Sequence, residues 1–238
     1  MFFADKIKEI PKNYKVLEVG PGGHPHPRSD IFLEKIFDDE HEASAQRGYA
    51  NKAAIKKKIV YYEGGTFPFE DNEFDYVICS HVLEHVPAED LKVFISEMQR
   101  VGKAGFIEYP NAFYEFINYQ PVHLWLMNYR NDTILFLDKN IFESNYIHKI
   151  FREMFYGNDK YLFEIFGRYR ELFFTHFEWS GNINYEIVNS YDELVNEEDF
   201  KKYQNYFLKF KKGKHSRKPL LYPLKHFIYK NLIKLKAK

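Results

Sequence analysis

The chain has 238 residues, a length that suits one domain with insertions better than two full domains. Hydrophobic residues make up 45% and charged residues 29%, a composition that favours a globular core over a disordered chain. The single cysteine, Cys79, excludes an internal disulfide framework, and no segment reaches the ~18 apolar residues of a membrane-spanning helix. We therefore expect a globular cytoplasmic protein.

The formal net charge of zero conceals an uneven distribution. Residues 201–238 contain thirteen Lys or Arg and no Asp or Glu, which leaves 21 basic against 34 acidic residues in residues 1–200. This pattern predicts an acidic domain over residues 1–200 and a basic C-terminal extension over residues 201–238.

Five short apolar segments predict strands, at residues 15–19, 30–34, 58–63, 74–80 and 105–109. The fourth segment, FDYVICS, is almost continuously apolar, which is typical of a strand covered on both faces. The first ends in the glycine turn GPGG, and the prolines of HPHPR at 24–28 exclude a helix directly after it. A helix is expected in the second half of residues 38–58.

A helix is predicted to begin at Pro87, with Glu89 and Asp90 in its first turn, and to end at Gly102. Apolar residues recur at helical spacing between these ends: Leu91, Phe94, Ile95, Met98 and Val101. Strands that alternate with helices predict a parallel sheet with right-handed crossovers. Ligands of such sheets bind at the carboxyl ends of the strands.

The pattern changes after Asn111. Two hairpins are expected, over residues 125–137 and 173–188, with helical structure over 141–170 that is interrupted at Gly157-Asn158. We interpret residues 112–200 as a lid and sheet extension on a core formed by residues 14–111.

Two acidic residues follow the expected strands in positions suited to a ligand. Glu18 precedes Gly20 and Gly22, whose backbone can approach a ligand closely, and an acid there can hold the ammonium of an amino-acid ligand. Glu34 ends the second strand and can accept the hydroxyls of a ribose. The alternatives are an ordinary turn for the glycines and a solvated loop carboxylate for Glu34.

A longer motif follows. Residues 67–87, FPFEDNEFDYVICSHVLEHVP, together with RVGKAG at 100–105 and YPN at 109–111, resemble the class I methyltransferases of the type-11 and ubiquinone-biosynthesis kind. The resemblance covers roughly residues 14–111. It implies an α/β, Rossmann-like, mostly parallel sheet with helices on both faces and S-adenosylmethionine as the cofactor.

The resemblance also implies which residues contact the cofactor. The glycine loop, the ribose-binding acid, the loop beside the adenine and the end of the fourth strand map onto Glu18, Gly20, Pro21, Gly22, Glu34, Gly65, Thr66, Phe67 and Ser80. This chain departs from the pattern at His24, which replaces the third glycine, and at Gly64, which replaces the acid that faces the adenine amino group. The segment between the glycine turn and the second strand is also too short for the usual helix.

Two histidines are candidates for the base that removes a proton from a hydroxyl acceptor. His81 is the first choice because it directly follows the fourth strand, and His123 is the second because it begins the expected lid. A hydrogen-bonded structural role is the alternative for each. His85 is expected to set the turn into the next helix. No metal is expected, because only His24 and His26 have ligand-like spacing, which proline stiffness explains equally well.

We expect O-methylation of a small molecule or a cell-surface glycan precursor, in polysaccharide biosynthesis. Two alternatives remain open: a methyltransferase-like binding protein without turnover, and a nucleic-acid methyltransferase. The amphipathic residues 212–238 could lie on an anionic membrane at its inner face or pack on the domain. Nucleic acid is disfavoured because the body is acidic and lacks a recognition motif. The sequence predicts no oligomeric state.

Overall fold

The computed structural model describes residues 1–23, 25–37, 57–118, 120–142, 164, 166–199, 201 and 203–205. The helix expected in residues 38–58, most of the helical segment 141–170 and the basic residues 212–238 lie outside these described residues. None of the described helices has both the length and the apolar content needed to cross a bilayer.

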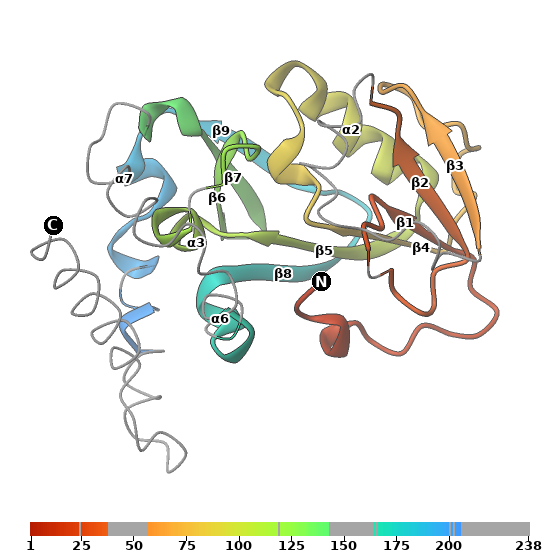
Figure 1. Ribbon diagram of the computed structural model, residues 1–238, viewed down its shortest axis with the longest axis horizontal. Helices are drawn as coiled ribbons and strands as arrows, with labels where there is room; N and C mark the ends of the chain where they lie inside the picture. The colour runs from red at the N-terminus through yellow and green to blue at the C-terminus, as the bar shows by residue number, and fades with distance from the viewer. Residues whose placement is uncertain are drawn as a thin grey trace, which may run out of the picture.

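A six-stranded sheet with the order β3-β2-β1-β4-β5-β8 forms the centre of the molecule (Figure 1). Its first five strands are parallel, and β8 pairs antiparallel with β5. The chain runs outward from β1 through β2 to β3, then returns to the other side of β1 to form β4 and β5. This reversal places a crevice at the carboxyl ends of β1 and β4, as expected for an α/β sheet. The strands are β1 Val16–Val19, β2 Ile31–Lys35, β3 Lys58–Tyr62, β4 Tyr76–Ser80, β5 Ala104–Pro110 and β8 Phe174–Ser180.

The five sequence-predicted parallel strands are therefore confirmed. Successive residues of β4 enter different cores because side chains alternate along a strand. Val77 and Cys79 belong to the core beneath α2, whereas Tyr76 and Ile78 belong to the core on the opposite face. Both faces of the sheet are thus covered, and the continuous apolar character of β4 follows.

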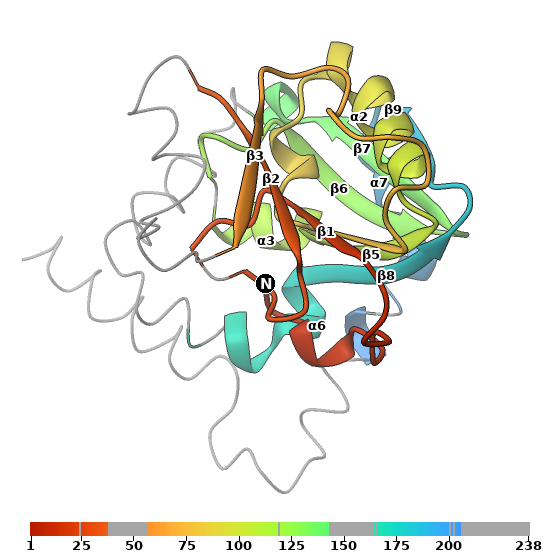
Figure 2. The same cartoon turned by 90° about the vertical axis from the view of Figure 1, so that its right-hand side faces the viewer.

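Helix α2, Ala88–Val101, covers one face of the sheet, and α6, Arg170–Phe173, lies against the other (Figure 2). The residues predicted to form the apolar stripe of α2 are all buried: Leu91, Phe94, Ile95, Met98 and Val101. The short helix η1, Ala4–Lys6, lies beside Phe3, which is fully buried in the same core as α6. The expected α/β architecture with helices on both faces is confirmed.

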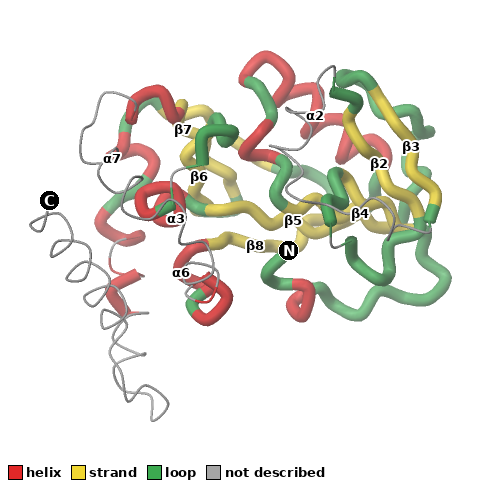
Figure 3. The backbone as a smooth tube through the Cα atoms, in the orientation of Figure 1, coloured by secondary structure: helices red, strands yellow, loops and turns green. Residues whose placement is uncertain are grey.

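The connection from β1 to β2 contains no helix in its described residues, and neither does that from β3 to β4 (Figure 3). The first agrees with the proline-rich segment after the glycine turn, because Pro25 and Pro27 cannot sit together inside a helix. In the described residues, loops therefore bound the crevice beside β1 and β3, whereas the start of α2, at Pro87 and Asp90, lines it after β4.

A second sheet of three strands, in the order β6-β7-β9, lies beyond β5. Strands β6, Trp125–Arg130, and β7, Thr133–Asp138, form the first hairpin expected from the sequence. The second expected hairpin is wrong. Strand β8 pairs with β5 of the large sheet, whereas β9, Asn184–Val188, pairs parallel with β7 of the small one. The turn Ser180-Gly181-Asn182 leads the chain from the large sheet to the small one. The edge of β5 pairs with β8, and the edge of β7 pairs with β9.

Short helices complete the connections around the small sheet. They are η3 Leu83–His85, α3 Ala112–Ile117, η4 Lys139–Phe142 and α7 Tyr191–Leu194. Asn111 caps α3 by accepting a hydrogen bond from the backbone N–H of Tyr114 at 3.1 Å. Buried side chains of α3 and α7 pack with apolar residues of the small sheet. These contacts hold α3, with Glu115 on it, next to the crevice.

Candidate active site

A cavity of about 450 Å³ opens at the carboxyl ends of β1, β2 and β4. This volume lies within the range of small-molecule sites. Its lining includes eight of the residues selected from the sequence: Gly20, Pro21, Gly22, Glu34, Gly65, Ser80, His81 and His123. Residues from the glycine turn, the end of β2 and the segment before β6, which are distant in sequence, therefore line one cavity.

The glycine turn requires its glycines. Gly20 and Gly22 have φ values of +61° and +56°, a conformation that side chains disfavour. A Cβ atom on Gly20 would also lie 2.6 Å from Cγ2 of Val82. The N–H of Gly20 donates to the carbonyl of Leu33 at 2.9 Å, which fixes the turn to the end of β2.

Beside the glycine turn, the cavity is lined by Glu34 at the end of β2 and by the glycine pair after β3. Gly64 and Gly65 have φ values of +112° and +72°. A Cβ on Gly65 would meet no atom within 4 Å, so the backbone here is open to a planar group. The carboxylate and the bare backbone are the features that a nucleoside would need.

Glu18 does not line the cavity. It is buried, and its carboxylate accepts hydrogen bonds from the N–H of His26 at 2.9 Å and from Oγ of Ser29 at 2.6 Å. Burial raises the pKa of Glu18 to about 7, with these two hydrogen bonds acting in the other direction. In this structure Glu18 fastens the proline-rich segment beneath the glycine turn.

Thr66 and Phe67 are also placed away from the cavity. Phe67 is buried between the rings of Tyr62 and Phe94, and its N–H donates to Glu97 at 2.7 Å. Thr66 lines a separate hollow, together with Glu70 and Arg100. Of the loop expected beside the adenine, Gly64 and Gly65 line the cavity, whereas Thr66 and Phe67 do not.

His81 lies between two buried carboxylates. Its Nε2 is 2.8 Å from Oε1 of Glu108, and its Nδ1 is 3.4 Å from Oε1 of Glu84. Burial lowers the pKa of His81, but these two carboxylates outweigh it and raise the pKa to about 9. His81 also has a φ of +58°, an uncommon conformation for a residue with a side chain. Strain of this kind is concentrated at functional sites.

Glu108 organises this corner of the cavity. Besides His81, it accepts hydrogen bonds from the N–H groups of Phe2 at 2.6 Å and Phe3 at 2.8 Å, and from Oγ of Ser80 at 3.3 Å. The N-terminal segment thereby reaches the cavity, whose lining includes Met1 and Phe2. Sequence reasoning missed Glu108. The signal was a carboxylate inside the apolar strand GFIEY, because a buried carboxylate is almost always paired.

His123 is held by a buried ion network. Its Nδ1 makes a hydrogen bond with Glu115, and the same carboxylate lies 2.7 Å from Nζ of Lys139. Burial opposes the ionisation of Glu115, but His123 and Lys139 outweigh it, so the pKa of Glu115 is lowered. An ionised Glu115 can only accept, so Nδ1 of His123 carries a proton, and in the neutral form of the ring Nε2 has the lone pair.

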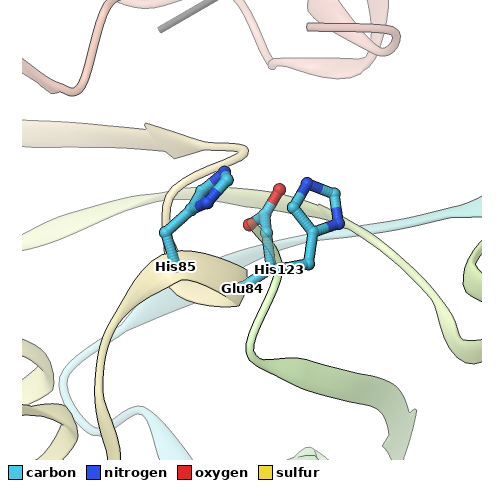
Figure 4. A group of neighbouring side chains, drawn as sticks. All are labelled: Glu84, His85 and His123. Atoms are coloured by element: carbon cyan, nitrogen blue, oxygen red, sulfur yellow. The ribbon is translucent and has the colours of Figure 1, made fainter. Parts of the chain in front are cut away.

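Two further residues of the LEH run reach the cavity: Glu84, which sequence reasoning missed, and His85. Nδ1 of His85 lies 3.0 Å from the carbonyl of Val122, so this side chain joins η3 to the segment that carries His123. Burial lowers the pKa of His85 to about 4, so it is neutral near pH 7. Figure 4 shows the Glu84 carboxylate between the rings of His85 and His123.

Comparison with known proteins agrees with this geometry. Residues 39–107 match a family described as "Methyltransferase domain". Ajmaline N-methyltransferase from Rauvolfia serpentina is 29% identical over 108 residues, which are 43% of this chain and 36% of that protein. Residues 39–107 of this chain are therefore similar to a methyltransferase domain.

Other relatives of this methyltransferase domain match comparable parts of it. Sterol 24-C-methyltransferase erg6 from Schizosaccharomyces pombe is 35% identical over 98 residues, 38% of this chain and 25% of that protein. The chain therefore matches only about a quarter to a third of the length of these curated relatives.

Solved structures match the same domain at low identity. YcgJ from Bacillus subtilis is 19% identical, covering 44% of this chain and 48% of its own, with a TM-score of 0.34. A SAM-dependent methyltransferase from Aquifex aeolicus is 21% identical, covering 46% and 64%, with a TM-score of 0.33. The fold assignment depends on the observed strand order rather than on these superpositions.

Proposed function

We propose that this protein transfers a methyl group from S-adenosylmethionine to an oxygen of a small molecule or glycan precursor. The observation that carries the proposal is a single cavity that joins a nucleoside-type half with a half containing histidines and carboxylates. The first half suits the methyl donor, and the second suits an acceptor whose proton must be removed.

The residues present fit S-adenosylmethionine. Glu34 stands at the end of β2, where a carboxylate can accept the two ribose hydroxyls, and Gly64 and Gly65 leave room for the adenine. Gly20 and Gly22 present bare backbone where the amino-acid end of the cofactor would lie. Bound S-adenosylmethionine supplies a methyl group that is already activated, so the protein has mainly to align the acceptor and exclude water.

His123 is better placed than His81 to accept a proton from the acceptor. Both nitrogens of His81 lie within 3.4 Å of a carboxylate oxygen, whereas His123, on the wall of the cavity, has its Nδ1 bonded to Glu115 and its Nε2 without a hydrogen bond to any described residue. A carboxylate behind the imidazole holds the ring and stabilises its protonated form. His81 then acts as a fixed cation that positions Glu84 and Glu108.

The acceptor atom is part of the proposal. One relative is named for methylating nitrogen and another for methylating carbon, so relatives of this domain serve different acceptors. Our preference for oxygen rests on the Glu115–His123 pair, because a hydroxyl needs a base. A role in polysaccharide biosynthesis, a cytoplasmic location and membrane contact through residues 212–238 remain predictions from the sequence.

Calorimetric titration of the full chain with S-adenosylmethionine and S-adenosylhomocysteine tests the cofactor. Micromolar binding is expected, and Glu34→Ala should weaken it about 10- to 100-fold, since hydrogen bonds to a charged group are lost. Glu186→Ala, an exposed carboxylate on β9, is the matched control and should bind normally. Absence of binding to either ligand would overturn the proposal.

Transfer of a labelled methyl group to a panel of hydroxylated acceptors tests the reaction. His123→Gln should lower turnover by about 100-fold or more, the contribution typical of a general base, while S-adenosylmethionine affinity is kept. Cofactor binding without any labelled product would instead favour the methyltransferase-like binding protein.

A further inference from the structure

Three side chains with metal-binding atoms meet at the acceptor end of the cavity. One ligand atom each of Glu84, His85 and His123 lies within 4.8 Å of the others, and all three residues line the cavity (Figure 4). We propose that they bind one divalent transition-metal cation of the Zn²⁺ type. The spacing of these residues in the sequence does not indicate such a site.

Both histidines are held with one nitrogen available. The carbonyl of Val122 can only accept a hydrogen bond, so Nδ1 of His85 carries the proton and Nε2 has the lone pair. Glu115 has the same effect on His123. A metal-binding histidine almost always donates its second N–H to a carbonyl or a carboxylate in this way. Here His85 donates to the carbonyl of Val122, and His123 donates to the carboxylate of Glu115.

Glu84 is the second, independent observation. Its side chain is only 1% exposed, and neither carboxylate oxygen has a hydrogen-bond partner among the described residues. Its charged neighbour is His81, whose Nδ1 lies 3.4 Å away without hydrogen-bond geometry. A buried carboxylate without hydrogen bonds is costly. A cation between Glu84 and the two imidazoles would supply the partner that the Glu84 carboxylate lacks.

The three side chains are also preorganised by the backbone. The N–H of Leu124 donates to the carbonyl of Glu84 at 2.7 Å, and His85 binds the carbonyl of Val122. These two bonds join the η3 turn to the segment that carries His123. The rings of His85 and His123 consequently lie edge to face with their centroids 4.7 Å apart.

The ligand types select the cation. Two imidazoles and one carboxylate are a set found in catalytic zinc sites, which keep a fourth position open. Mg²⁺ and Ca²⁺ prefer oxygen ligands and are disfavoured here. The open position would face the cavity, where it suits an oxygen of the methyl acceptor. This last point rests on the proposed function; the metal site itself does not.

A cation on Nε2 of His123 excludes that nitrogen from acting as a base. The cation would then make a bound acceptor hydroxyl more acidic, so that its proton passes to solvent water, and Glu115 would position the ligand instead of the base. Activity that is lost with a chelator and restored by Zn²⁺ distinguishes this arrangement from the metal-free one.

The test uses the full chain after removal of metal, without S-adenosylmethionine or acceptor. Calorimetry with Zn²⁺, and visible absorption with Co²⁺, should show one site per chain and a raised melting temperature on binding. Glu84→Gln and His85→Gln should each weaken binding by about 10-fold or more. His176→Gln is the matched control, because this half-buried histidine of β8 is outside the cavity, and it should bind normally.

Two results would overturn the proposal. Zn²⁺ affinity unchanged in both folded ligand variants would assign the metal to adventitious sites, and Mg²⁺ binding as tight as Zn²⁺ binding would contradict the nitrogen ligands. Circular dichroism shows whether each variant is folded, and having two variants keeps the test valid if one is not. Because S-adenosylmethionine binding is measured separately, either the metal site or the proposed function can fail alone.

Discussion

Nζ of Lys139 lies 2.7 Å from Oε2 of Glu115, and the two side chains are only 4% and 1% exposed. Lys139 begins η4 after the β6–β7 hairpin, whereas Glu115 belongs to α3. The pair therefore joins the small sheet to the helix that follows β5. Because Glu115 also holds His123, the same carboxylate serves both the fold and the site.

Removal of one partner from this buried pair should destabilise the protein strongly. Glu115→Gln or Lys139→Met should each cost about 3–5 kcal/mol of unfolding free energy, because a buried charge is left uncompensated. The double variant should lose less than the sum of the two single variants. Urea unfolding of all four proteins measures the coupling.

The exposed pair Lys201–Glu197, at 2.8 Å, is the matched control for this cycle. Glu197→Gln should change the unfolding free energy by about 0.5 kcal/mol or less, as is usual for surface ion pairs. Additive losses for Glu115 and Lys139 would contradict the coupling that we describe.

Gly20→Ala should impair both folding and cofactor binding. Its φ of +61° costs a residue with a side chain about 1–2 kcal/mol, and Val82 must also move away from the new Cβ atom. The displaced turn should lower S-adenosylmethionine affinity, which calorimetry measures beside thermal unfolding.

Gly167→Ala provides the matched control for this substitution. Gly167 is exposed in a helical turn, and a Cβ there meets no atom within 4 Å. The variant should be more stable by about 0.5–1 kcal/mol, because alanine is favoured over glycine in helices. Equal behaviour of the two alanine variants would contradict the role given to the Gly20 conformation.

Glu18 should make stability fall as the pH rises from about 4.5 to about 7. Burial raises its folded pKa to about 7 from an ordinary 4.5, so the folded state holds the proton more tightly than the unfolded state. Glu18→Gln removes this dependence and should gain about 2–3 kcal/mol relative to the wild type between pH 5 and pH 8. Urea unfolding at several pH values measures the gain.

Asp75→Asn is the control, because the pKa of Asp75 is shifted in the direction opposite to that of Glu18. The pKa of Asp75 is lowered, by its hydrogen bonds with Lys103 and the N–H of Lys15, so its contribution is lost only as the pH falls into the acid range. Its difference from the wild type should stay constant from pH 5 to pH 8. If the difference in unfolding free energy between Glu18→Gln and the wild type stayed at the same small value from pH 4 to pH 8, the pKa of Glu18 would not be raised.

Local patterns predicted much of the parallel core. The apolar spacing from Leu91 to Val101 predicted α2 and its buried face, because burial of one helix face depends on residues that are near in sequence. The continuous apolar run of β4 and the glycines after β1 were informative for the same reason. Glu34, Ser80, His81 and His123 could be selected because each lies in or near a recognisable motif or strand end.

The pairing of strands outside that core could not be predicted in this way. A short turn after Ser180 resembles a hairpin turn, but the open edges of β5 and β7 took β8 and β9 into different sheets. Pairing energy depends on which edges and apolar faces are available in space, and a local pattern does not contain that information.

The sequence by itself determined the central parallel strands, helix α2, the glycine turn and the acid at the end of β2, because each follows from short-range periodicity and backbone preference. Only the tertiary structure decided that Glu18 is turned inward to Ser29 and that Glu108 and Glu84 flank His81. It also brought His123 to Glu84 and His85. The reason is physical: burial and hydrogen-bond direction arise from contacts between segments far apart in the chain, and these decide what a polar side chain does.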